Sequence, residues 1–452
     1  MTKLRLTIFL LFSMSSALSV FWGFALERAA QGIIVDFKVV YYGARCLVDH
    51  HDPYDENQLM SVYLAEGGKH PSNPIELNKV RQVVALQVYF PTAFIYIAPF
   101  AMLPWGIAHA LWSALTAGTL TLAAFLIWTL VQDAPAAAFY LTCFLLANSG
   151  ILFAGGNPAG IAIALCLVAS WCFLEDKHAY VGVACFAVSL ALKPHDTGFV
   201  WLYFFLAGGL FRKRALQTLL IAVALALPAI RWVSHVSPHW IQELSGNLSA
   251  ISVRGGIIDP GPSGMSGSGT GMIIALQTVI SVFRDDPRFY NPLTYLICGA
   301  LLLVWIWVIR RARSTALNHY LALAAIAALS MLPIYHRPQD AKLLLLTLPA
   351  CAMLLREGGA IGRIALLLNS AAIVVTSDLP LALLVQFIKG LHLSTDDTKG
   401  KILTVLITRP IPLVLFTLGV FYLSVYLHHS LRGNTFAGAQ SQPSPVVSAR
   451  PS

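Results

Sequence analysis

Long uncharged apolar runs, separated by short polar turns, dominate the chain. An α-helix needs about 20 predominantly apolar residues to cross the hydrocarbon core of a membrane. The pattern therefore predicts an all-α polytopic membrane protein, and 13 apolar segments are present. They cover residues 6–26, 82–103, 105–131, 134–154, 157–174, 179–193, 197–211, 215–233, 292–309, 316–335, 341–355, 361–387 and 402–427.

Polar stretches interrupt this series at three places, and a polar tail ends it. Residues 27–81 and 234–291 form two long loops, and residues 389–400 form a shorter one. The Ser-, Pro- and Gly-rich tail after residue 428 has too few apolar residues to pack. We therefore expect one transmembrane domain over residues 1–428, followed by a disordered cytoplasmic tail over residues 429–452.

Composition narrows the class of protein further. Hydrophobic residues make up 57% of the chain and charged residues only 11%, whereas about 25% of the residues of a soluble domain are charged. A soluble enzyme and a disordered protein are excluded. The formal charge of +9 comes largely from Lys and Arg clusters beside apolar runs. Such clusters mark cytoplasmic loops and argue against a nucleic-acid partner.

The cysteines and the first apolar run add two expectations. Six of the seven cysteines lie within apolar segments, so we expect them to pack between helices rather than to form disulfides or metal sites. The run from Leu6 to Leu26 is longer than the apolar core of a signal peptide, which has about 7–15 residues. We interpret it as a retained first helix.

The positive-inside rule orients the segments. Lys3 and Arg5 place the N-terminus inside, which puts loops 27–81 and 234–291 on the outer face. Loop 27–81 and the turn at 155–158 then lie on the same side, although three apolar segments separate them. One of these segments must fail to span, which predicts about 12 crossings. Segment 82–103 contains Pro91 and Pro99, and segment 134–154 ends at the turn 155–158, so either segment could be the broken one. Broken helices at membrane depth usually line a cavity or a site.

Loop 27–81 is rich in ionisable residues and begins close to the membrane surface. Asp36 follows the first helix, and the stripe Phe37, Val40, Tyr41, Ala44 and Val48 predicts an amphipathic helix lying flat in the interface. Asp36 is either the N-cap of that helix or a general base at the depth of a lipid head group. The two roles are compatible.

Further ionisable groups stand at apolar helix ends on the same outer face. Such residues are costly in a membrane and often functional, although an interfacial anchor is the alternative for each. The run 49–55 contains two histidines and three aspartates, but its Asp-Pro favours a turn over a metal site. The glycine-rich stretch 255–271 predicts either a mobile lid or a plain flexible loop. The outer-face candidates are Lys193, His195, Arg231, His336, Arg337, Asp340 and Lys342.

Several short motifs follow one another along the chain. They are Asp36-Phe37, Tyr41 to Arg45, Asp52 to Asp55, Tyr89-Phe90-Pro91 with Ala98-Pro99-Phe100 and Leu103-Pro104, Gly156-Asn157, Leu192-Lys193-Pro194, and His336-Arg337 with Asp340. Their order resembles glycosyltransferase family 87, the polyprenol-phosphate-mannose-dependent mannosyltransferases of the GT-C superfamily. The likeness covers about residues 1–428. Gly156 stands where the family usually has Gln, and Thr92 where it has a second Pro.

The resemblance implies a GT-C-like bundle and a reaction. A sugar, by family default mannose, would pass from a polyprenyl-phosphate donor to a glycolipid or glycan acceptor with inversion, at the outer face of a bacterial inner membrane. Asp36 would be the base, and neither a metal nor another cofactor would be required. The implied substrate-binding residues are Lys193, His336, Arg337, Asp340, Arg254, Tyr41 and Asn157.

A competing hypothesis is a transporter or flippase for an anionic lipid, in which the same charges would line a translocation path. Transporters commonly contain two matching halves with broken helices at corresponding positions. The chain shows no such internal repeat. The long polar loop after the first helix also favours an enzyme.

Overall fold

The structure is a computed structural model that describes residues 3–29, 36–68, 70–73, 77, 80–131, 135–256, 258–262, 273–389 and 397–439. Helices dominate this part of the chain, and no strand occurs in it. The prediction of an all-α protein is therefore confirmed.

Seven helices among the described residues are long and apolar enough to cross a membrane. An eighth span results if α18 (Gly359–Val375) and α19 (Asp378–Lys389), which meet at a 69° bend, count as one. A polytopic membrane protein is confirmed, whereas the expected count of about 12 crossings is not. The seven spans are α1 (Lys3–Ala29), α6 (Trp105–Trp128), α7 (Ala136–Ala147) with α8 (Gly150–Gly155), α12 (Gly209–Val236), α15 (Pro287–Arg311), η2 (Pro338–Thr347) with α17 (Leu348–Glu357), and α21 (Pro410–Ala439).

Several expected spans are shorter helices. Segment 82–103 yields only a π-turn, η1 (Arg81–Ala85), and the 11-residue α5 (Pro91–Ala101). At 1.5 Å per residue α5 is about 16 Å long, about half of the hydrocarbon core. By contrast, segment 134–154 forms the 20-residue span of α7 and α8. Of the two candidates for the segment that fails to span, segment 82–103 is thus the one with the shorter helix. The other short helices are α9 (Ala159–Leu174), α10 (Ala179–Leu192), α11 (Pro194–Ala207) and α16 (Ala316–Leu329).

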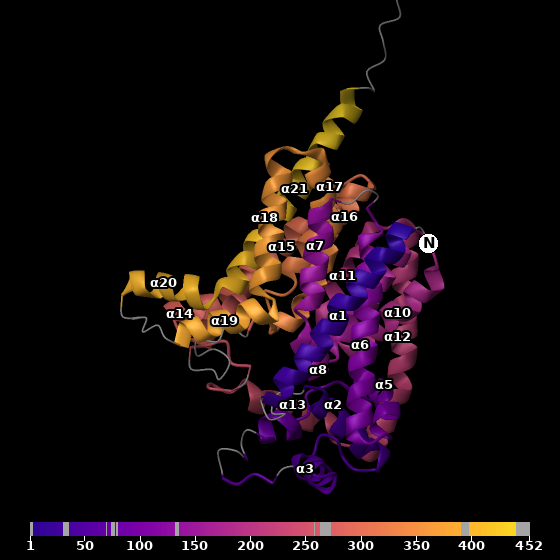
Figure 1. The fold of residues 1–452 in the computed structure, drawn as a ribbon, viewed down its shortest axis with the longest axis vertical. Coiled ribbons are helices and arrows are strands. Elements are labelled where there is room, and N and C mark those ends of the chain that lie inside the picture. Colours follow the sequence, from indigo (N-terminus) through magenta and orange to yellow (C-terminus); the bar gives the residue numbers. More distant parts are fainter. Residues whose placement is uncertain are drawn as a thin grey trace, which may run out of the picture.

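The long helices form a bundle whose two ends differ (Figure 1). The chain starts at one end, and α1 leads to the other, where α2 (Asp36–Val48), α3 (Glu56–Ala65) and α13 (Trp240–Ser252) gather. Three helices project sideways from the bundle: α14 (Leu276–Phe283), α19 and α20 (Thr398–Thr408). The expected segment 402–427 is therefore divided between α20 and α21.

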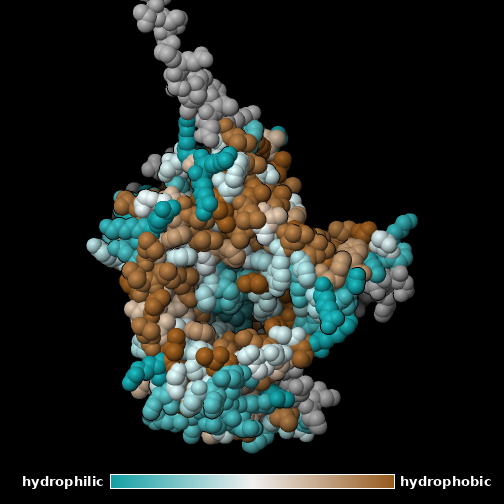
Figure 2. Space-filling view, turned by 180° about the vertical axis from the view of Figure 1, so that it is seen from behind, coloured by the Kyte–Doolittle hydropathy of each residue, from teal (hydrophilic) through white to brown (hydrophobic). Residues whose placement is uncertain are grey.

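The surface of the bundle is suited to lipid. Leu220 and Leu227 on α12 and Leu296 and Leu303 on α15 are exposed, and apolar residues cover much of the middle of the face that Figure 2 shows. Apolar surface of this extent is rare on soluble proteins. In the same view a hollow with hydrophilic walls interrupts this apolar surface near the polar end of the molecule.

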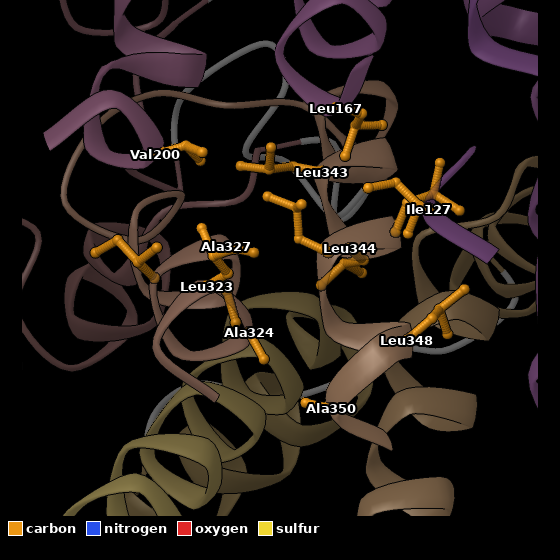
Figure 3. Packing of buried hydrophobic residues seen from close by; sticks show 14 of the residues in the cluster. Ile127, Leu167, Val200, Leu323, Ala324, Ala327, Leu343, Leu344, Leu348 and Ala350 are labelled. Atoms are coloured by element: carbon orange, nitrogen blue, oxygen red, sulfur yellow. The ribbon is translucent and has the colours of Figure 1, made fainter. Parts of the chain in front are cut away.

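The core of the bundle is built around η2, all of whose residues are buried. Leu343 and Leu344 of this 3₁₀ helix lie among side chains of α6, α9, α11 and α16 (Figure 3). Because an apolar helix packed on every side has little freedom to shift, η2 holds the residues at its N-terminal end in place. Those residues, 336–340, belong to the site described below.

Helix α2 forms where the periodicity predicts it, but its apolar stripe does not face lipid. Phe37 and Tyr41 are fully buried, and Phe37 stacks on Trp112 of α6 with ring centroids 5.0 Å apart. The expectation of a helix lying flat in the interface was wrong in this respect. The stripe packs against α5 and α6, which is a more specific partner than lipid because aromatic rings interlock there.

The C-terminal tail and the glycine-rich stretch lie partly outside the described residues. Helix α21 continues to Ala439, beyond the expected domain boundary at residue 428. The remainder of the predicted disordered tail, residues 440–452, lies outside the described residues. The same holds for residues 263–272, which include the second half of the glycine-rich stretch 255–271.

Candidate active site

A cavity of about 410 Å³ lies between α2, residues 86–89 after η1, α13 and the segment that leads into η2. One part of its wall is polar and contains acidic, basic and amide side chains. The remainder is apolar. The polar lining residues are Asp36, Tyr89, Asn157, Lys193, His195, Tyr335, Arg337 and Asp340, and the apolar ones are Val39, Leu86, Val88, Leu248, Ile251, Ile258 and Ile334.

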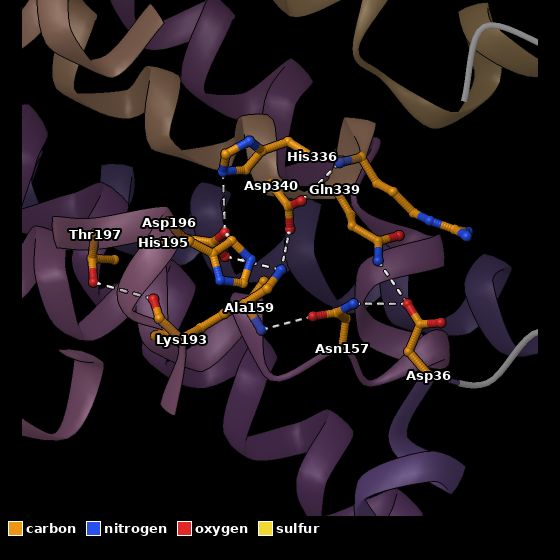
Figure 4. A network of polar contacts seen from close by, with 12 residues as sticks. Asp36, Asn157, Ala159, Lys193, His195, Asp196, Thr197, His336, Gln339 and Asp340 are labelled. Atoms are coloured by element: carbon orange, nitrogen blue, oxygen red, sulfur yellow. Dashed lines mark hydrogen bonds and ion pairs between the residues drawn. The ribbon is translucent and has the colours of Figure 1, made fainter. Parts of the chain in front are cut away.

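Asp36 is the acidic residue that two amide side chains hold at this wall. Its Oδ2 atom accepts hydrogen bonds from Asn157 Nδ2 at 2.8 Å and from Gln339 Nε2 at 2.7 Å (Figure 4). Asp36 also stands in the first turn of α2, where a carboxylate favours the helix dipole. The helix-end and site interpretations of Asp36 are thus compatible, as the sequence suggested.

The turn before α9 places Asn157 beside Asp36. Gly156 has a positive φ of 63°, and a Cβ atom there would lie 2.8 Å from Phe37 Cβ. Its carbonyl oxygen accepts a 2.8 Å hydrogen bond from Trp112 Nε1. Asn157 Oδ1 in turn accepts the backbone N–H of Ala159 at 2.9 Å. Only glycine suits this turn, which fixes the amide of Asn157 toward the carboxylate.

Lys193 joins two buried carboxylates, of which Asp340 also lines the cavity. Its Nζ atom lies 2.9 Å from Asp340 Oδ1 and 3.0 Å from Asp196 Oδ2. Lys193 is 8% exposed, and the two aspartates are 3% and 2% exposed. Lys193 caps α10 and Asp196 begins α11, while Asp340 comes from η2. The triad therefore ties the two helices to the central element through desolvated charges.

Arg337 is the cation most available to the cavity. Among the described residues its guanidinium contacts the Tyr335 hydroxyl and has no ion pair, and its backbone N–H donates to Asp340 Oδ2 at 2.8 Å. Burial would lower the pKa of Arg337, but Tyr335 and Asp36 outweigh it and raise this pKa. Burial raises the pKa of Tyr335. Arg337 is therefore a permanent positive charge beside Asp36.

Two histidines flank Asp196 on the side away from Lys193. His195 Nε2 lies 3.2 Å and His336 Nε2 3.3 Å from Asp196 Oδ1. His195 lines the cavity, whereas His336 is 1% exposed and lies behind the wall. Burial would lower the pKa of His336, but the carboxylate of Asp196 outweighs it and raises this pKa.

Other candidates lie away from the cavity. The Tyr41 hydroxyl donates to the carbonyl oxygen of Leu103 at 2.7 Å, and Arg254 is exposed and pairs with Asp285. Arg231 is exposed near the end of α12. Lys342 is buried and donates to the carbonyl oxygen of Asn148 at 3.2 Å. None of these four lines the cavity.

The histidine-rich run 49–55 forms the predicted turn. Asp52 Oδ1 accepts the backbone N–H of Tyr54 at 2.8 Å, and Asp49 pairs with Arg45 at 3.0 Å. Both carboxylates are thus engaged locally.

Sequence reasoning did not single out Gln339 or Asp196. Gln339 stands within the polar run 335–340, but nothing in that run shows that its amide reaches Asp36. For Asp196 a signal existed, because it follows Lys193 by three residues at the start of an apolar helix. An acid and a base at this spacing on one helix face attract each other.

The family profile of glycosyltransferase family 87 matches residues 88–334, or 247 of the 452 residues. The chain belongs to glycosyltransferase family 87. It is a membrane glycosyltransferase, and this assignment favours an enzyme over a transporter or flippase. The matched range contains Asn157, Lys193 and Asp196, whereas Asp36 and Asp340 lie outside it. No curated protein and no solved structure matches the chain.

Proposed function

We propose that this family 87 enzyme transfers a hexose, mannose by family default, from a polyprenyl-phosphate donor to a glycolipid or glycan hydroxyl. The arrangement that carries the proposal is the carboxylate of Asp36, held by two amides at a cavity that also contains Arg337 and Lys193. The base and the cations that would bind phosphate thus line the same cavity.

Asp36 is the general base of the proposed reaction. The acceptor oxygen attacks the anomeric carbon and gives its proton to Asp36, while the bond from that carbon to the phosphate oxygen breaks and its electron pair leaves with the phosphate. A single displacement of this kind inverts the anomeric configuration. The amides of Asn157 and Gln339 occupy Oδ2, so Oδ1 is the oxygen best placed to accept the proton.

Arg337 and Lys193 stabilise the departing phosphate. The donor is a phosphodiester with one negative charge, and the released polyprenyl phosphate carries up to two. Positive charge beside the cavity therefore stabilises the transition state, in which the bond is breaking, more than it stabilises the bound donor. Arg337 is the direct contact, because Lys193 already pairs with Asp196 and Asp340.

The apolar wall suits the lipid part of a substrate. Val39, Leu86, Val88, Leu248 and Ile251 line one continuous cavity with the polar residues. An amphipathic ligand with a charged head and a branched hydrocarbon chain matches this division. Since the cavity lies at the bundle end that carries loops 27–81 and 234–291, we place the reaction at the outer face of a bacterial inner membrane.

The test uses purified protein in lipid nanodiscs with a panel of polyprenyl-phosphate sugars and membrane-extract acceptors. Release of free polyprenyl phosphate is measured for the parent and for Asp36→Asn. Removing a general base lowers the rate about 10²- to 10⁴-fold. Asp49→Asn, which breaks only an exposed pair with Arg45, is the matched control and keeps the parent rate.

Two results would contradict the proposal. Equal release by the parent and by a folded Asp36→Asn would remove Asp36 as the base. Release with none of the donors would exclude polyprenyl-phosphate sugars as the substrate class, and sugar-nucleotide donors would then be tried.

A further inference from the structure

His195, Asp196 and His336 form a compact cluster of three potential metal ligands. One ligand-type atom from each residue lies within 4.8 Å of the other two. Asp196 and His336 are 2% and 1% exposed. Asp196 Oδ2 pairs with Lys193 at 3.0 Å. Asp196 Oδ1 and the Nε2 atom of His336 are also buried, and among the described residues their partners are each other and, for Oδ1, His195. Two imidazole nitrogens thus converge on one buried carboxylate oxygen, an arrangement that a metal ion can occupy.

The proton positions make the cluster more unusual. His336 Nδ1 lies 3.2 Å from the carbonyl oxygen of Ile334, which can only accept, so Nδ1 carries the hydrogen. The lone pairs of Nε2 and of Asp196 Oδ1, 3.3 Å away, need a positive charge between them. That charge is either a proton on Nε2, in keeping with the raised pKa of His336, or a metal ion bound to both atoms. A metal-bound histidine has the same arrangement, with its second ring N–H donated to a backbone carbonyl.

We infer that His195, Asp196 and His336 bind a divalent transition-metal ion, with Zn²⁺ as the species that fits the donor set best. Two imidazoles and one carboxylate are a common Zn²⁺ set with an open fourth position, whereas Mg²⁺ and Ca²⁺ prefer oxygen ligands. The spacing also agrees. With metal–ligand distances of about 2.0–2.1 Å, neighbouring ligands of a tetrahedral site are about 3.3 Å apart, and the contacts to Asp196 Oδ1 measure 3.2 and 3.3 Å.

The surrounding charges favour a cation at this place. Asp196 and Asp340 carry two negative charges and Lys193 one positive charge, so the cluster with neutral histidines has one negative charge in excess. A divalent ion changes this excess to one positive charge. Lys193 holds the second carboxylate oxygen of Asp196 at 3.0 Å, which leaves Oδ1 oriented toward the imidazoles. Such an outer contact commonly orients a metal-ligating carboxylate.

The ion would lie next to the cavity, because His195 also lines it. Binding of the ion does not depend on which sugar donor the enzyme uses. A contribution of the ion to binding the donor phosphate rests on the proposed function. The site differs from the histidine-rich run 49–55 and goes beyond the metal independence that the family resemblance implies.

The experiment uses full-length protein without a polyhistidine tag, freed of metal with EDTA and titrated with Co²⁺ alone. Tetrahedral Co²⁺ with nitrogen ligands absorbs visible light, and Zn²⁺ should displace it. We expect one ion per chain in the parent and in His50→Ala, a control that removes a histidine from the turn. His195→Ala should bind at least about tenfold more weakly, and Zn²⁺ should raise the unfolding temperature of the parent but not of this variant.

His195→Ala decides the matter even if His336→Ala fails to fold, because the side chain of His195 is 42% exposed. Absence of Co²⁺ and Zn²⁺ binding by the parent would overturn the site, and so would equal binding by the parent and His195→Ala. Sugar transfer by metal-free protein would contradict a role of the ion in the reaction and leave the proposed function intact. One-to-one binding without transfer from any donor would uphold the site and contradict the proposed donor.

Discussion

Gln339 donates a 2.7 Å hydrogen bond to Asp36, although 303 residues separate them. Asn157, 121 residues from Asp36, donates the second bond to the same oxygen. The carboxylate is thus oriented by the central 3₁₀ helix and by the turn before α9, both of which are packed in the bundle. A base positioned by rigid elements retains its geometry when the substrate enters.

Gln339→Ala should lower kcat about tenfold or more and change the KM for the donor little. A hydrogen bond to a charged group contributes about 1.5–3 kcal/mol, and the variant leaves Asp36 in place but less well oriented. The measurement is steady-state release of polyprenyl phosphate. Gln242→Ala, on the exposed side of α13, is the control and should behave as the parent. An unchanged kcat would show that Gln339 has no part in positioning Asp36.

Lys193→Ala should destabilise the folded protein by about 3–5 kcal/mol, because Asp196 and Asp340 would remain buried without their cation. Thermal unfolding in detergent measures the effect. Lys177→Ala removes another lysine ion pair, which is exposed at the surface, and should cost less than about 1 kcal/mol.

The double variant Lys193→Ala with Asp340→Asn tests the cause. It removes one of the two unpaired negative charges, so part of the lost stability should return. A double variant less stable than Lys193→Ala alone would show that charge is not the cause.

The pattern of apolar residues was sufficient to predict where helices form, but not how they bend and pack against one another. Helix α1 and helix α6 follow directly from their apolar runs, because a long uncharged run in lipid has few alternatives to a helix. The 69° bend between α18 and α19 was not predicted, since Ser377 and Asp378 look like ordinary polar residues in the sequence. In the structure Asp378 Oδ2 accepts the backbone N–H of Ile151 at 2.8 Å. That contact depends on tertiary structure.

In the candidate site, too, the sequence identified individual residues but not which of them come together. Ionisable residues at apolar helix ends are costly without a purpose, and this argument identified Lys193, Arg337 and Asp340, which line one cavity with Asp36. The argument could not separate them from Arg231 and Lys342, which have the same local character. Only the packing of η2 against α9 and α16 decides which charges meet, and sequence periodicity does not contain that packing.

Gly156→Ala should destabilise the protein by at least about 2 kcal/mol and lower activity as well. The positive φ of 63° is unfavourable for alanine, and its Cβ would crowd Phe37 and Trp112. Gly118→Ala in α6 is the matched control, because its Cβ would meet nothing within 4 Å and alanine favours a helix by about 0.5–1 kcal/mol. Equal unfolding temperatures for the two variants would contradict the proposed need for glycine at position 156.

Arg337→Gln should reduce kcat/KM for the donor about 10- to 100-fold, since a hydrogen bond between charged groups contributes about 1.5–3 kcal/mol. Arg337→Lys should recover part of the loss, because lysine keeps the charge but not the planar pair of donors. Arg231→Gln, at an exposed arginine of α12, is the control and should keep the parent value.

Product inhibition separates phosphate binding by Arg337 from a general effect on folding. Polyprenyl phosphate carries more negative charge than the donor phosphodiester, so loss of Arg337 should weaken its inhibition more than it raises the KM for the donor. The inhibition constant of polyprenyl phosphate and the donor KM are measured on the same preparation. If both rise by the same factor, Arg337 contributes equally to binding donor and product, and the stabilisation of the leaving group must come from Lys193 or from another cation at the cavity.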